Sequence, residues 1–263
     1  MDLQLSGART VITGGASHIG RAITLAFAGE GAAIAIIDKD EVQATRTAAD
    51  AVTAGAAACS SHGADLTDHA AADAAMQSAI STLGGIDVLV TNVGFNTPAF
   101  FMDTPPESWD HLLHGNLSSC MSCVRAALPA MQEQGHGAIV ATASTAAFGE
   151  PRQGVYAAAK AGVVAFIRTI AQEYGRFGIR ANLVAPGLVL PDDASTLGEL
   201  SIWHRQDSVM NDSQVAYVEK ATPMRRLSKP DDIANSILFL ASDRTARQLT
   251  GQMLTVSGGF AMR

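Results

Sequence analysis

Arg9-Thr-Val-Ile-Thr-Gly-Gly-Ala-Ser-His-Ile-Gly20 is the stretch of this chain that decides its fold. The apolar run at residues 9–13 predicts a buried strand, and the glycine-rich residues after it lead into a helix over residues 21–28. Glycines let the backbone turn tightly and approach a phosphate, while the free N–H groups and positive dipole end of the helix attract its charge. The stretch therefore predicts a cradle for a dinucleotide diphosphate. The expected cofactor contacts here are Gly14, Ser17, His18, Ile19 and Gly20.

An acidic residue, Asp38, follows the next apolar run, residues 32–37. In a dinucleotide-binding unit, a carboxylate at this point accepts hydrogen bonds from the adenosine ribose hydroxyls and repels a 2′-phosphate. The neighbouring Lys39 softens that repulsion. Asp38 therefore favours NAD as the cofactor, with NADP as the weaker alternative.

Short apolar runs separated by helical patterns recur along the whole chain. Strands that alternate with helices form a parallel sheet covered on both faces, joined by right-handed crossovers. The sequence therefore predicts an α/β fold, a doubly wound Rossmann-like parallel sheet of about seven strands, as one domain over residues 1–263. The expected strands are residues 9–13, 32–37, 60–64, 86–91, 137–142, 179–185 and 252–256.

A tyrosine and a lysine, Tyr156 and Lys160, stand four residues apart in an expected helix over residues 153–176, and Ser144 comes shortly before it. Residues four apart share one face of a helix. An ammonium beside a phenol favours the phenolate, so Lys160 is expected to lower the tyrosine pKa from its ordinary value of about 10. The hydroxyl of Ser144 can hold the oxygen of an alcohol or ketone while Tyr156 gives or takes a proton. The three residues predict acid–base chemistry on alcohols.

Together these features resemble the short-chain dehydrogenase/reductase family over residues 7–259. The resemblance implies hydride transfer between a nicotinamide and a carbinol carbon. It makes Tyr156 the proton donor or acceptor, and it makes Lys160 both the group that lowers the Tyr156 pKa and a ligand of the nicotinamide ribose. It also implies that Ser144 orients the substrate oxygen and that Asn116 supports Lys160 through a water. Further implied cofactor contacts are Asp65, Leu66, Asn92, Gly94, Pro186, Gly187 and Val189.

Three positions depart from the family pattern. His18 stands where the family has the central glycine of the phosphate loop, so that loop geometry or cofactor affinity is expected to be unusual. The interval from Ser144 to Tyr156, 12 residues, is shorter than is common. Pro191 replaces a threonine that, in the family, often bonds the nicotinamide carboxamide, so that contact must come from elsewhere.

Residues 187–223 contain no expected strand, and the resemblance implies that they form a lid over the substrate. Lids of this kind exclude water from the reaction. Together with aromatic residues on neighbouring loops, they predict a mostly apolar and aromatic substrate pocket. The expected substrate contacts are Asn96, Phe148, Glu150 and Trp203.

Composition narrows the class of protein. The formal net charge of −7 and the lack of a basic cluster argue against nucleic acid and anionic membrane surfaces as partners. No signal peptide and no apolar run of membrane-spanning length are expected. Three cysteines form no disulfide framework, which predicts a reducing cytoplasm.

Two pairs of possible metal ligands fall in an expected helix over residues 106–134. Cys120 and Cys123 have the spacing of a packed helix face, and buried thiols usually behave as small apolar groups. His111 and His114 have no acidic or thiol partner at ligand spacing. No metal site is therefore expected.

The substrate is expected to be a small-molecule alcohol or ketone, apolar and cyclic or aryl. The segments around Ser144 and residues 256–260 are similar to dehydrogenases of alicyclic hydroxyacyl-CoA compounds and other ring alcohols. The alternative is a 3-oxoacyl-thioester reductase, and a more distant one is a non-catalytic NAD-binding sensor. The family resemblance also implies a homotetramer built on the helices at residues 106–134 and 153–176.

Overall fold

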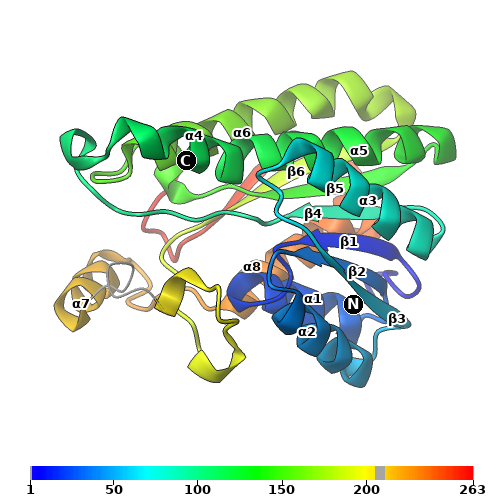
Figure 1. Ribbon diagram of the computed structural model, residues 1–263, viewed down its shortest axis with the longest axis horizontal. Helices are drawn as coiled ribbons and strands as arrows, with labels where there is room; N and C mark the ends of the chain where they lie inside the picture. The colour runs from blue at the N-terminus through cyan, green and yellow to red at the C-terminus, as the bar shows by residue number, and fades with distance from the viewer. Residues whose placement is uncertain (1, 205–210, 263) are drawn as a thin grey trace.

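One sheet of seven parallel strands forms the centre of the computed structural model, which describes residues 2–204 and 211–262. The strand order is β3-β2-β1-β4-β5-β6-β7, which confirms the predicted fold class (Figure 1). The order reverses between β1 and β4, and ligands of such sheets bind beyond the carboxyl ends of the strands at this switch point. The strands are β1 (Arg9–Thr13), β2 (Ala33–Asp38), β3 (Ala58–Gly63), β4 (Val88–Thr91), β5 (Gly137–Thr142), β6 (Ile179–Pro186) and β7 (Met253–Val256).

Helices cover both faces of this sheet (Figure 1). Three of them, α3, α5 and α6, pack on one face, and α1, α2 and α8 pack on the other. Helix α7 lies apart from the sheet and buries none of its residues. The α-helices are α1 (His18–Gly29), α2 (Glu41–Ala54), α3 (His69–Leu83), α4 (Trp109–Leu113), α5 (Ser119–Gln134), α6 (Gly154–Tyr174), α7 (Asp212–Ala221), α8 (Pro230–Ala241) and α9 (Asp243–Ala246).

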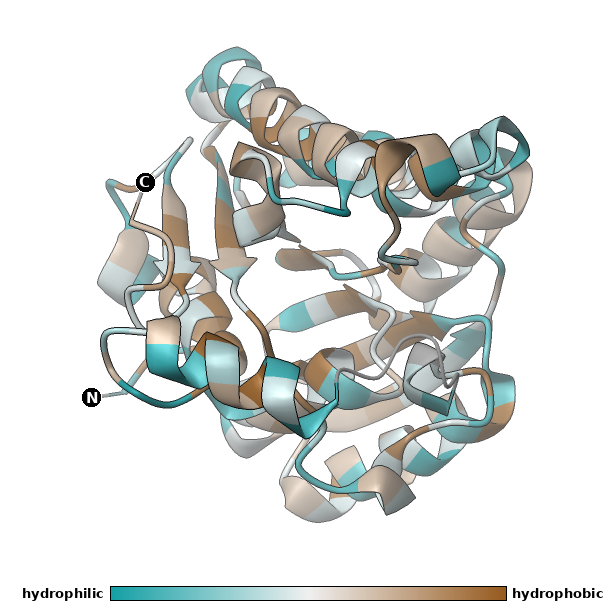
Figure 2. Cartoon of the chain, turned by 90° about the vertical axis from the view of Figure 1, so that its left-hand side faces the viewer, coloured by the Kyte–Doolittle hydropathy of each residue, from teal (hydrophilic) through white to brown (hydrophobic). Residues whose placement is uncertain are grey.

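The strands are apolar throughout because both of their faces are buried. Side chains alternate along a strand, so Val11 and Ile37 join the core under α3, α5 and α6, whereas Ile12 and Ile36 join the core over α1, α2 and α8. Figure 2 shows this as brown strands inside and teal patches on the outer helices. The strands fall within two residues of the predicted ranges.

The expected helix over residues 106–134 is wrong as a single regular helix. It consists of a 3₁₀ turn (Pro106–Ser108), α4, a π-helical turn (His114–Ser118) and α5. The π turn contains Asn116, whose side-chain N–H donates to the Leu112 carbonyl oxygen at 2.9 Å. Such wide turns are frequent at functional sites. The helix predicted over residues 153–176 is α6, and the one predicted from residue 21 begins three residues earlier, at His18.

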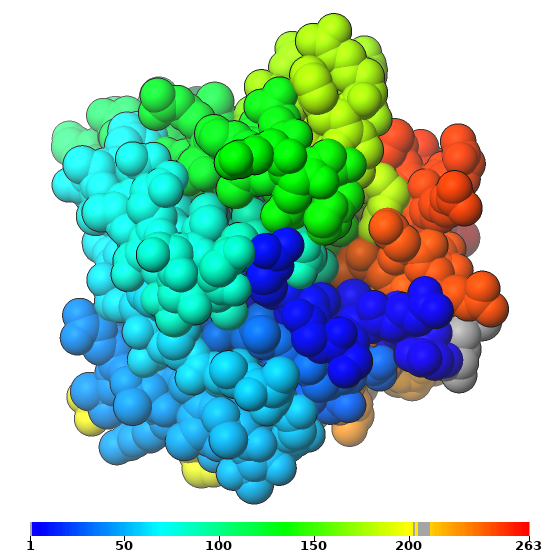
Figure 3. Space-filling model, turned by 90° about the vertical axis from the view of Figure 1, so that its right-hand side faces the viewer, coloured from blue at the N-terminus to red at the C-terminus, as the bar shows by residue number. Residues whose placement is uncertain are grey.

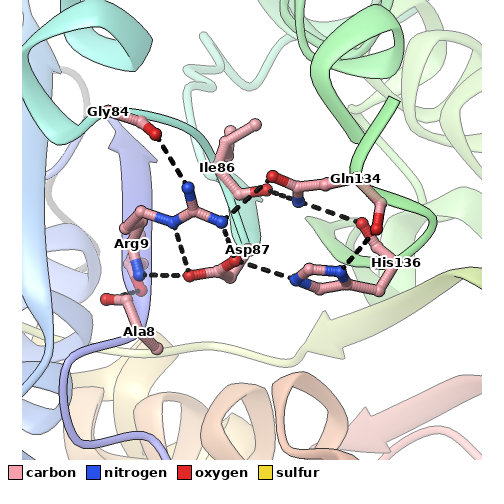
Figure 4. A network of polar contacts seen from close by, with 8 residues as sticks. Ala8, Arg9, Gly84, Ile86, Asp87, Gln134 and His136 are labelled. Atoms are coloured by element: carbon pink, nitrogen blue, oxygen red, sulfur yellow. Dashed lines mark hydrogen bonds and ion pairs between the residues drawn. The ribbon is translucent and has the colours of Figure 1, made fainter. Parts of the chain in front are cut away.

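A polar network ties the amino ends of three strands together (Figure 4). These strand ends lie on the side of the molecule opposite the switch point, which is the side that faces the viewer in Figure 3. Asp87 accepts hydrogen bonds from the Arg9 side chain and from its backbone N–H, and His136 lies 3.0 Å from the same carboxylate. The Arg9 guanidinium also donates to the carbonyl of Gly84 and to the side chain of Gln134. This network holds the Asp87 pKa at about 2, because these bonds outweigh the effect of burial. It fixes β1, β4 and β5 relative to one another.

Helix α6 with the turn after it (Gly154–Phe177) is long and apolar enough to cross a membrane by length and composition alone. No such helix was expected. In the structure this helix packs against β6 and against the 3₁₀ turn Thr145–Phe148, and it contributes Val163 and Ile167 to the core. Its apolar residues are thus explained in part by the core of the fold.

Candidate active site

A cavity of about 570 Å³ lies at the carboxyl ends of the strands, on the edge of the sheet that faces the viewer in Figure 2. Residues that follow β1, β2, β4, β5 and β6 all contribute to its lining. The predicted cofactor positions in this lining are Gly14, Ser17, His18, Ile19, Gly20, Asp38, Asp65, Leu66, Asn92, Gly94, Pro186, Gly187 and Val189.

The glycine-rich loop enters α1 at the switch point. Gly14 has a φ of +62°, and a Cβ on Gly20 would come within 1.7 Å of the Gly14 carbonyl oxygen, so both positions require glycine. Ser17 precedes α1 but makes no side-chain capping bond, which leaves the N–H groups of the first turn available. An available helix N-terminus beside a close-packed glycine turn fits the diphosphate of a dinucleotide.

His18 departs from glycine but keeps the backbone conformation that glycine would adopt, with a φ of +50°. Its Nδ1 accepts a hydrogen bond from Trp203 Nε1 at 3.2 Å, and the two ring centroids lie 5.1 Å apart. Burial lowers the His18 pKa to about 4, so the ring is neutral near pH 7. Contacts of the ring with the backbone of Leu190 and Val189 oppose that shift. His18 therefore connects the phosphate loop to the expected lid.

Asp38 is half-buried at the end of β2 and lines the cavity. Its carboxylate accepts hydrogen bonds from the backbone N–H groups of Ala16 and Asp40, both at 3.1 Å. Burial raises the pKa of Asp38, and these two bonds oppose that shift. The carboxylate is held in place and retains acceptor capacity toward the cavity, which fits a ribose diol.

Ser144, Tyr156 and Lys160 come together in the same cavity. The Ser144 hydroxyl accepts from the Ala146 backbone N–H at 3.1 Å, and its proximity to the Tyr156 phenol acts to lower the pKa of that phenol. The Lys160 ammonium lies 5.8 Å from the centroid of the Tyr156 ring and donates to the Thr142 carbonyl oxygen at 3.0 Å. These contacts bring a hydroxyl, a phenol and an ammonium together at the end of β5, with the helical turn of α6 supplying the second and third.

Burial, rather than Lys160, sets the direction of the Tyr156 pKa in this structure, and the lowering of that pKa by Lys160 stays a prediction. Burial raises the Tyr156 pKa to about 12; the Ser144 hydroxyl opposes the shift and the nearby Glu150 carboxylate adds to it. Burial also lowers the pKa of Lys160 to about 8, which weakens the positive charge on which the expectation depended. Both shifts have one cause, because removing water disfavours whichever form of a group is charged.

Asn116 is buried behind the cavity rather than in its lining. Its Oδ1 accepts from the Phe95 backbone N–H at 3.1 Å, and its Nδ2 donates to the Phe95 carbonyl oxygen at 2.8 Å. A Cβ on Gly94 would lie 2.9 Å from both Asn116 Oδ1 and Lys160 Nζ, so these two side chains flank Gly94. Asn116 thus fixes the loop after β4 beside Lys160.

Three of the four expected substrate contacts line the cavity, and one does not. Asn96, Glu150 and Trp203 line the cavity, whereas Phe148 ends the 3₁₀ turn Thr145–Phe148 outside that lining, and its assignment stays a prediction. Residues 205–210 of the expected lid lie outside the described residues.

The described part of the expected lid contacts the cofactor half of the cavity as well. The Gln43 side chain donates to the Thr196 carbonyl oxygen at 3.0 Å, and the Leu200 N–H lies 3.4 Å from an Asp40 carboxylate oxygen. Together with the bond between Trp203 and His18, these contacts hold residues 196–203 against the start of α2, against the turn before it and against the phosphate loop.

Several cavity residues were missed by sequence reasoning. His111, for which sequence reasoning left a structural and a substrate-facing role open, lines the cavity, with its ring centroid 4.7 Å from that of Phe95. Gln153, three residues before Tyr156, carried no motif signal. Others that carried no signal are Thr67, Gln214 and Val218. Within residues 2–204 and 211–262, no three His, Cys, Asp or Glu side chains group as metal ligands do.

The fold and this site define a class, the Rossmann-like α/β proteins with a serine, tyrosine and lysine cluster at the switch point. A family model described as enoyl-(acyl carrier protein) reductase matches residues 14–261. The (2S)-[(R)-hydroxy(phenyl)methyl]succinyl-CoA dehydrogenase subunit BbsD of Thauera aromatica is 36% identical over 254 residues, 96% of each chain. This chain belongs to the short-chain dehydrogenase/reductase family of oxidoreductases.

Solved structures agree with this membership. A 7α-hydroxysteroid dehydrogenase complexed with NADH and 7-oxo glycochenodeoxycholic acid matches with a TM-score of 0.88 and 32% identity, covering 98% of this chain and 96% of that chain. The 3-ketoacyl-(acyl-carrier-protein) reductase of Brucella melitensis, complexed with NADH, matches with a TM-score of 0.86 and 29% identity, covering 98% of this chain and 100% of that chain.

Proposed function

We propose that this protein is an NAD-dependent oxidoreductase that interconverts a secondary alcohol and a ketone. The observation that carries the proposal is that Ser144, Tyr156 and Lys160 line the same cavity as the glycine-rich loop and Asp38. A cradle for a dinucleotide beside an acid–base cluster is the combination that coupled hydride and proton transfer requires.

The chain's own residues bind and orient the reactants and move the proton. The glycine-rich loop would hold the cofactor diphosphate, Asp38 the adenosine ribose and Lys160 the nicotinamide ribose. When bound, NAD supplies a hydride acceptor, and its reduced form supplies a hydride donor. The Ser144 hydroxyl holds the substrate oxygen beside the Tyr156 phenol. In oxidation the ionised Tyr156 oxygen takes the substrate O–H proton, and in reduction the neutral Tyr156 phenol gives its proton to the substrate oxygen.

Cofactor preference follows from the charge at the end of β2. The Asp38 carboxylate would bond to the two ribose hydroxyls of NAD, but would face the negative charge of a 2′-phosphate in NADP. Two structural relatives are complexed with NADH, which supports the preference. We expect kcat/KM to be much higher with NAD than with NADP. In an Asp38→Ala variant the ratio of these two values should fall. A wild-type preference for NADP would contradict the proposal.

The substrate is proposed to be a cyclic or aryl secondary alcohol or its ketone, including a hydroxyacyl-CoA. The relative from Thauera aromatica is named for a phenyl-substituted hydroxyacyl-CoA, and the 7α-hydroxysteroid dehydrogenase is bound to an oxo-steroid. The second candidate is reduction of a 3-oxoacyl thioester, favoured by the Brucella melitensis relative. Steady-state assays of ring alcohols, aryl alcohols and acyl thioesters with NAD and with NADH separate the two. Tight NAD binding without turnover of any of them would instead support a sensor.

A lid over residues 187–223 and a homotetramer complete the proposal. The bonds from Thr196 and Trp203 to the cofactor half of the cavity support a segment that closes over bound reactants. The α6 segment is apolar enough to cross a membrane, yet only a third of its most apolar window is buried within the chain, which supports a further copy covering the rest. Light scattering at micromolar concentration tests this assembly, and a monomer would reject it.

A further inference from the structure

Three polar side chains, Asn96, Gln153 and Glu150, form a row on the substrate side of the cavity, and all three line it. Asn96 Nδ2 donates to Gln153 Oε1 at 3.0 Å, and the Gln153 backbone N–H donates to the Glu150 backbone carbonyl oxygen at 3.3 Å. The Gln153 side chain also acts to lower the pKa of the Glu150 carboxyl, as a hydrogen-bond donor beside a carboxylate does. The Glu150 carboxylate therefore ends the row.

The charge at the end of this row is not neutralised. Glu150 is half-buried, and it forms no ion pair within residues 2–204 and 211–262. The cation nearest in sequence, Arg152, is directed elsewhere: its Nη2 lies 3.5 Å from the Pro98 carbonyl oxygen and its guanidinium 5.7 Å from the centre of the Phe100 ring. Burial raises the Glu150 pKa, as expected for a carboxylate without a cationic partner.

This carboxylate lies close to the acid–base cluster. Its charge is among the causes that raise the Tyr156 pKa, so the two groups share one electrostatic environment. One Asn96 N–H is already used within the row, in the bond to Gln153. Glu150 and the Asn96 amide oxygen retain acceptor capacity that no bond within the described residues uses. The substrate side of the cavity thus offers acceptors and negative charge.

We propose that Glu150 and Asn96 make this enzyme select substrates that carry a second hydrogen-bond donor, a hydroxyl or an ammonium group, on the ring away from the reacting carbon. The inference rests on the proposed alcohol–ketone activity and names its substrate class more narrowly. An ammonium group gains both a hydrogen bond and charge attraction. A carboxylate at the same place is repelled by Glu150 and is selected against.

The test compares four cyclohexanones that differ only at ring position 4, each reduced with NADH: the hydroxy, ammonium, methoxy and carboxylate compounds. The methoxy compound keeps the acceptor oxygen of the hydroxy compound but has no donor. A hydrogen bond to a charged group corresponds to about a tenfold effect or more, so kcat/KM is expected to be about tenfold higher for the hydroxy and ammonium compounds than for the methoxy compound. The carboxylate compound is expected to fall about tenfold below it.

A Glu150→Gln variant separates the charge from the shape of the pocket. In this variant the ratio of kcat/KM for the ammonium compound to that for the carboxylate compound should fall by about tenfold or more. The control is Glu133→Gln, which makes the same change at an exposed position on α5 and should leave the ratio unchanged. Equal kcat/KM for all four ketones in the wild-type enzyme, or an unchanged ratio in Glu150→Gln, would overturn the inference while leaving the proposed function intact. Absence of turnover for every ring ketone and alcohol would overturn the proposed function itself.

Discussion

At the scale of single residues, burial governs the ionisation of the proposed catalytic pair. Lys160 is 3% exposed, and its ammonium has one protein acceptor, the Thr142 carbonyl oxygen, among the described residues. Both Lys160 and Tyr156 are therefore shifted toward their neutral forms, with pKa values of about 8 and about 12. Chemistry near neutral pH requires the reverse shift for the tyrosine, which bound reactants must help to supply.

The Lys160 shift predicts how stability depends on pH. The unfolded chain keeps this proton up to an ordinary pKa of 10.5, whereas the folded chain releases it above about 8. The unfolded state thus binds more protons between these values, so the unfolding free energy should rise with pH there. From pH 8 to pH 9.5 the rise is about 1–2 kcal/mol. Urea unfolding should show it as the difference between the wild-type chain and Lys160→Met, and a constant difference would contradict it.

His18 predicts an order of stability among its own substitutions. Its backbone has a φ of +50°, which glycine adopts without strain and alanine does not. His18→Gly and His18→Ala both lose the bond from Trp203, so the comparison between them isolates the backbone. We expect the glycine variant to be more stable than the alanine variant by about 1 kcal/mol in urea unfolding. Equal stability, or a more stable alanine variant, would show that the left-handed backbone carries no strain.

The sequence predicts which residues form the proposed catalytic cluster better than it predicts which side chains bond to one another across the fold. The Tyr156 to Lys160 spacing brings both residues to one cavity because an α-helix fixes which residues share a face. The bond between Trp203 and His18 joins residues 185 positions apart, and the row from Asn96 to Glu150 spans two loops. No local pattern encodes such pairs, since they arise only when the fold is complete.

At the scale of elements, the two ends of the strands have different roles. The cavity lies at the carboxyl ends of the strands, and the network around Arg9 and Asp87 lies at their amino ends (Figure 4). A network far from the chemistry, with a carboxylate between an arginine and a histidine, is expected to serve stability rather than turnover.

Asp87→Asn tests that role. The folded-state pKa of Asp87 is about 2, below the ordinary value of 3.8, so its stabilising effect is present above pH 4 and is lost as pH falls toward 2. Because the group is partly exposed, we expect the variant to lose about 1–2 kcal/mol at pH 7. Thermal unfolding at several pH values should show the two chains converging below pH 4. A variant with wild-type stability at pH 7 would contradict the role.

The positions of strands and helices can be predicted from the sequence where they depend only on which residues are buried. The seven strands were predicted to within two residues because continuous apolar runs between helices have few other interpretations. The interruption of the helix at His114–Ser118 was not predicted, because it depends on the side chain of Asn116 bonding to the backbone around it. Periodicity alone cannot show such a bond.

At the scale of the whole molecule, the proposed tetramer explains an apolar surface that the chain itself leaves uncovered. Three alanines on α6, Ala158, Ala161 and Ala165, are exposed. Small residues on a long helix allow another helix to approach closely.

Ala165→Arg is expected to break this assembly. The substitution suits a helix in propensity but adds a charge and a long side chain where a second copy is proposed to pack. Light scattering should report a smaller species, while circular dichroism should report an unchanged fold. Ala49→Arg, the same substitution at an exposed position of α2 on the other face of the sheet, controls for an added surface charge in general and should leave the assembly unchanged. A wild-type tetramer that persists in Ala165→Arg would place the interface elsewhere.

The central claim is that the Tyr156 oxygen transfers the proton in an alcohol–ketone interconversion. The most direct measurement is the single-turnover rate of ketone reduction by Tyr156→Phe with bound NADH, alongside its NADH affinity. Loss of a general acid should lower the rate by about a hundredfold to ten-thousandfold, with the NADH dissociation constant close to the wild-type value. A variant that binds NADH normally and reduces ketones at the wild-type rate would contradict the account.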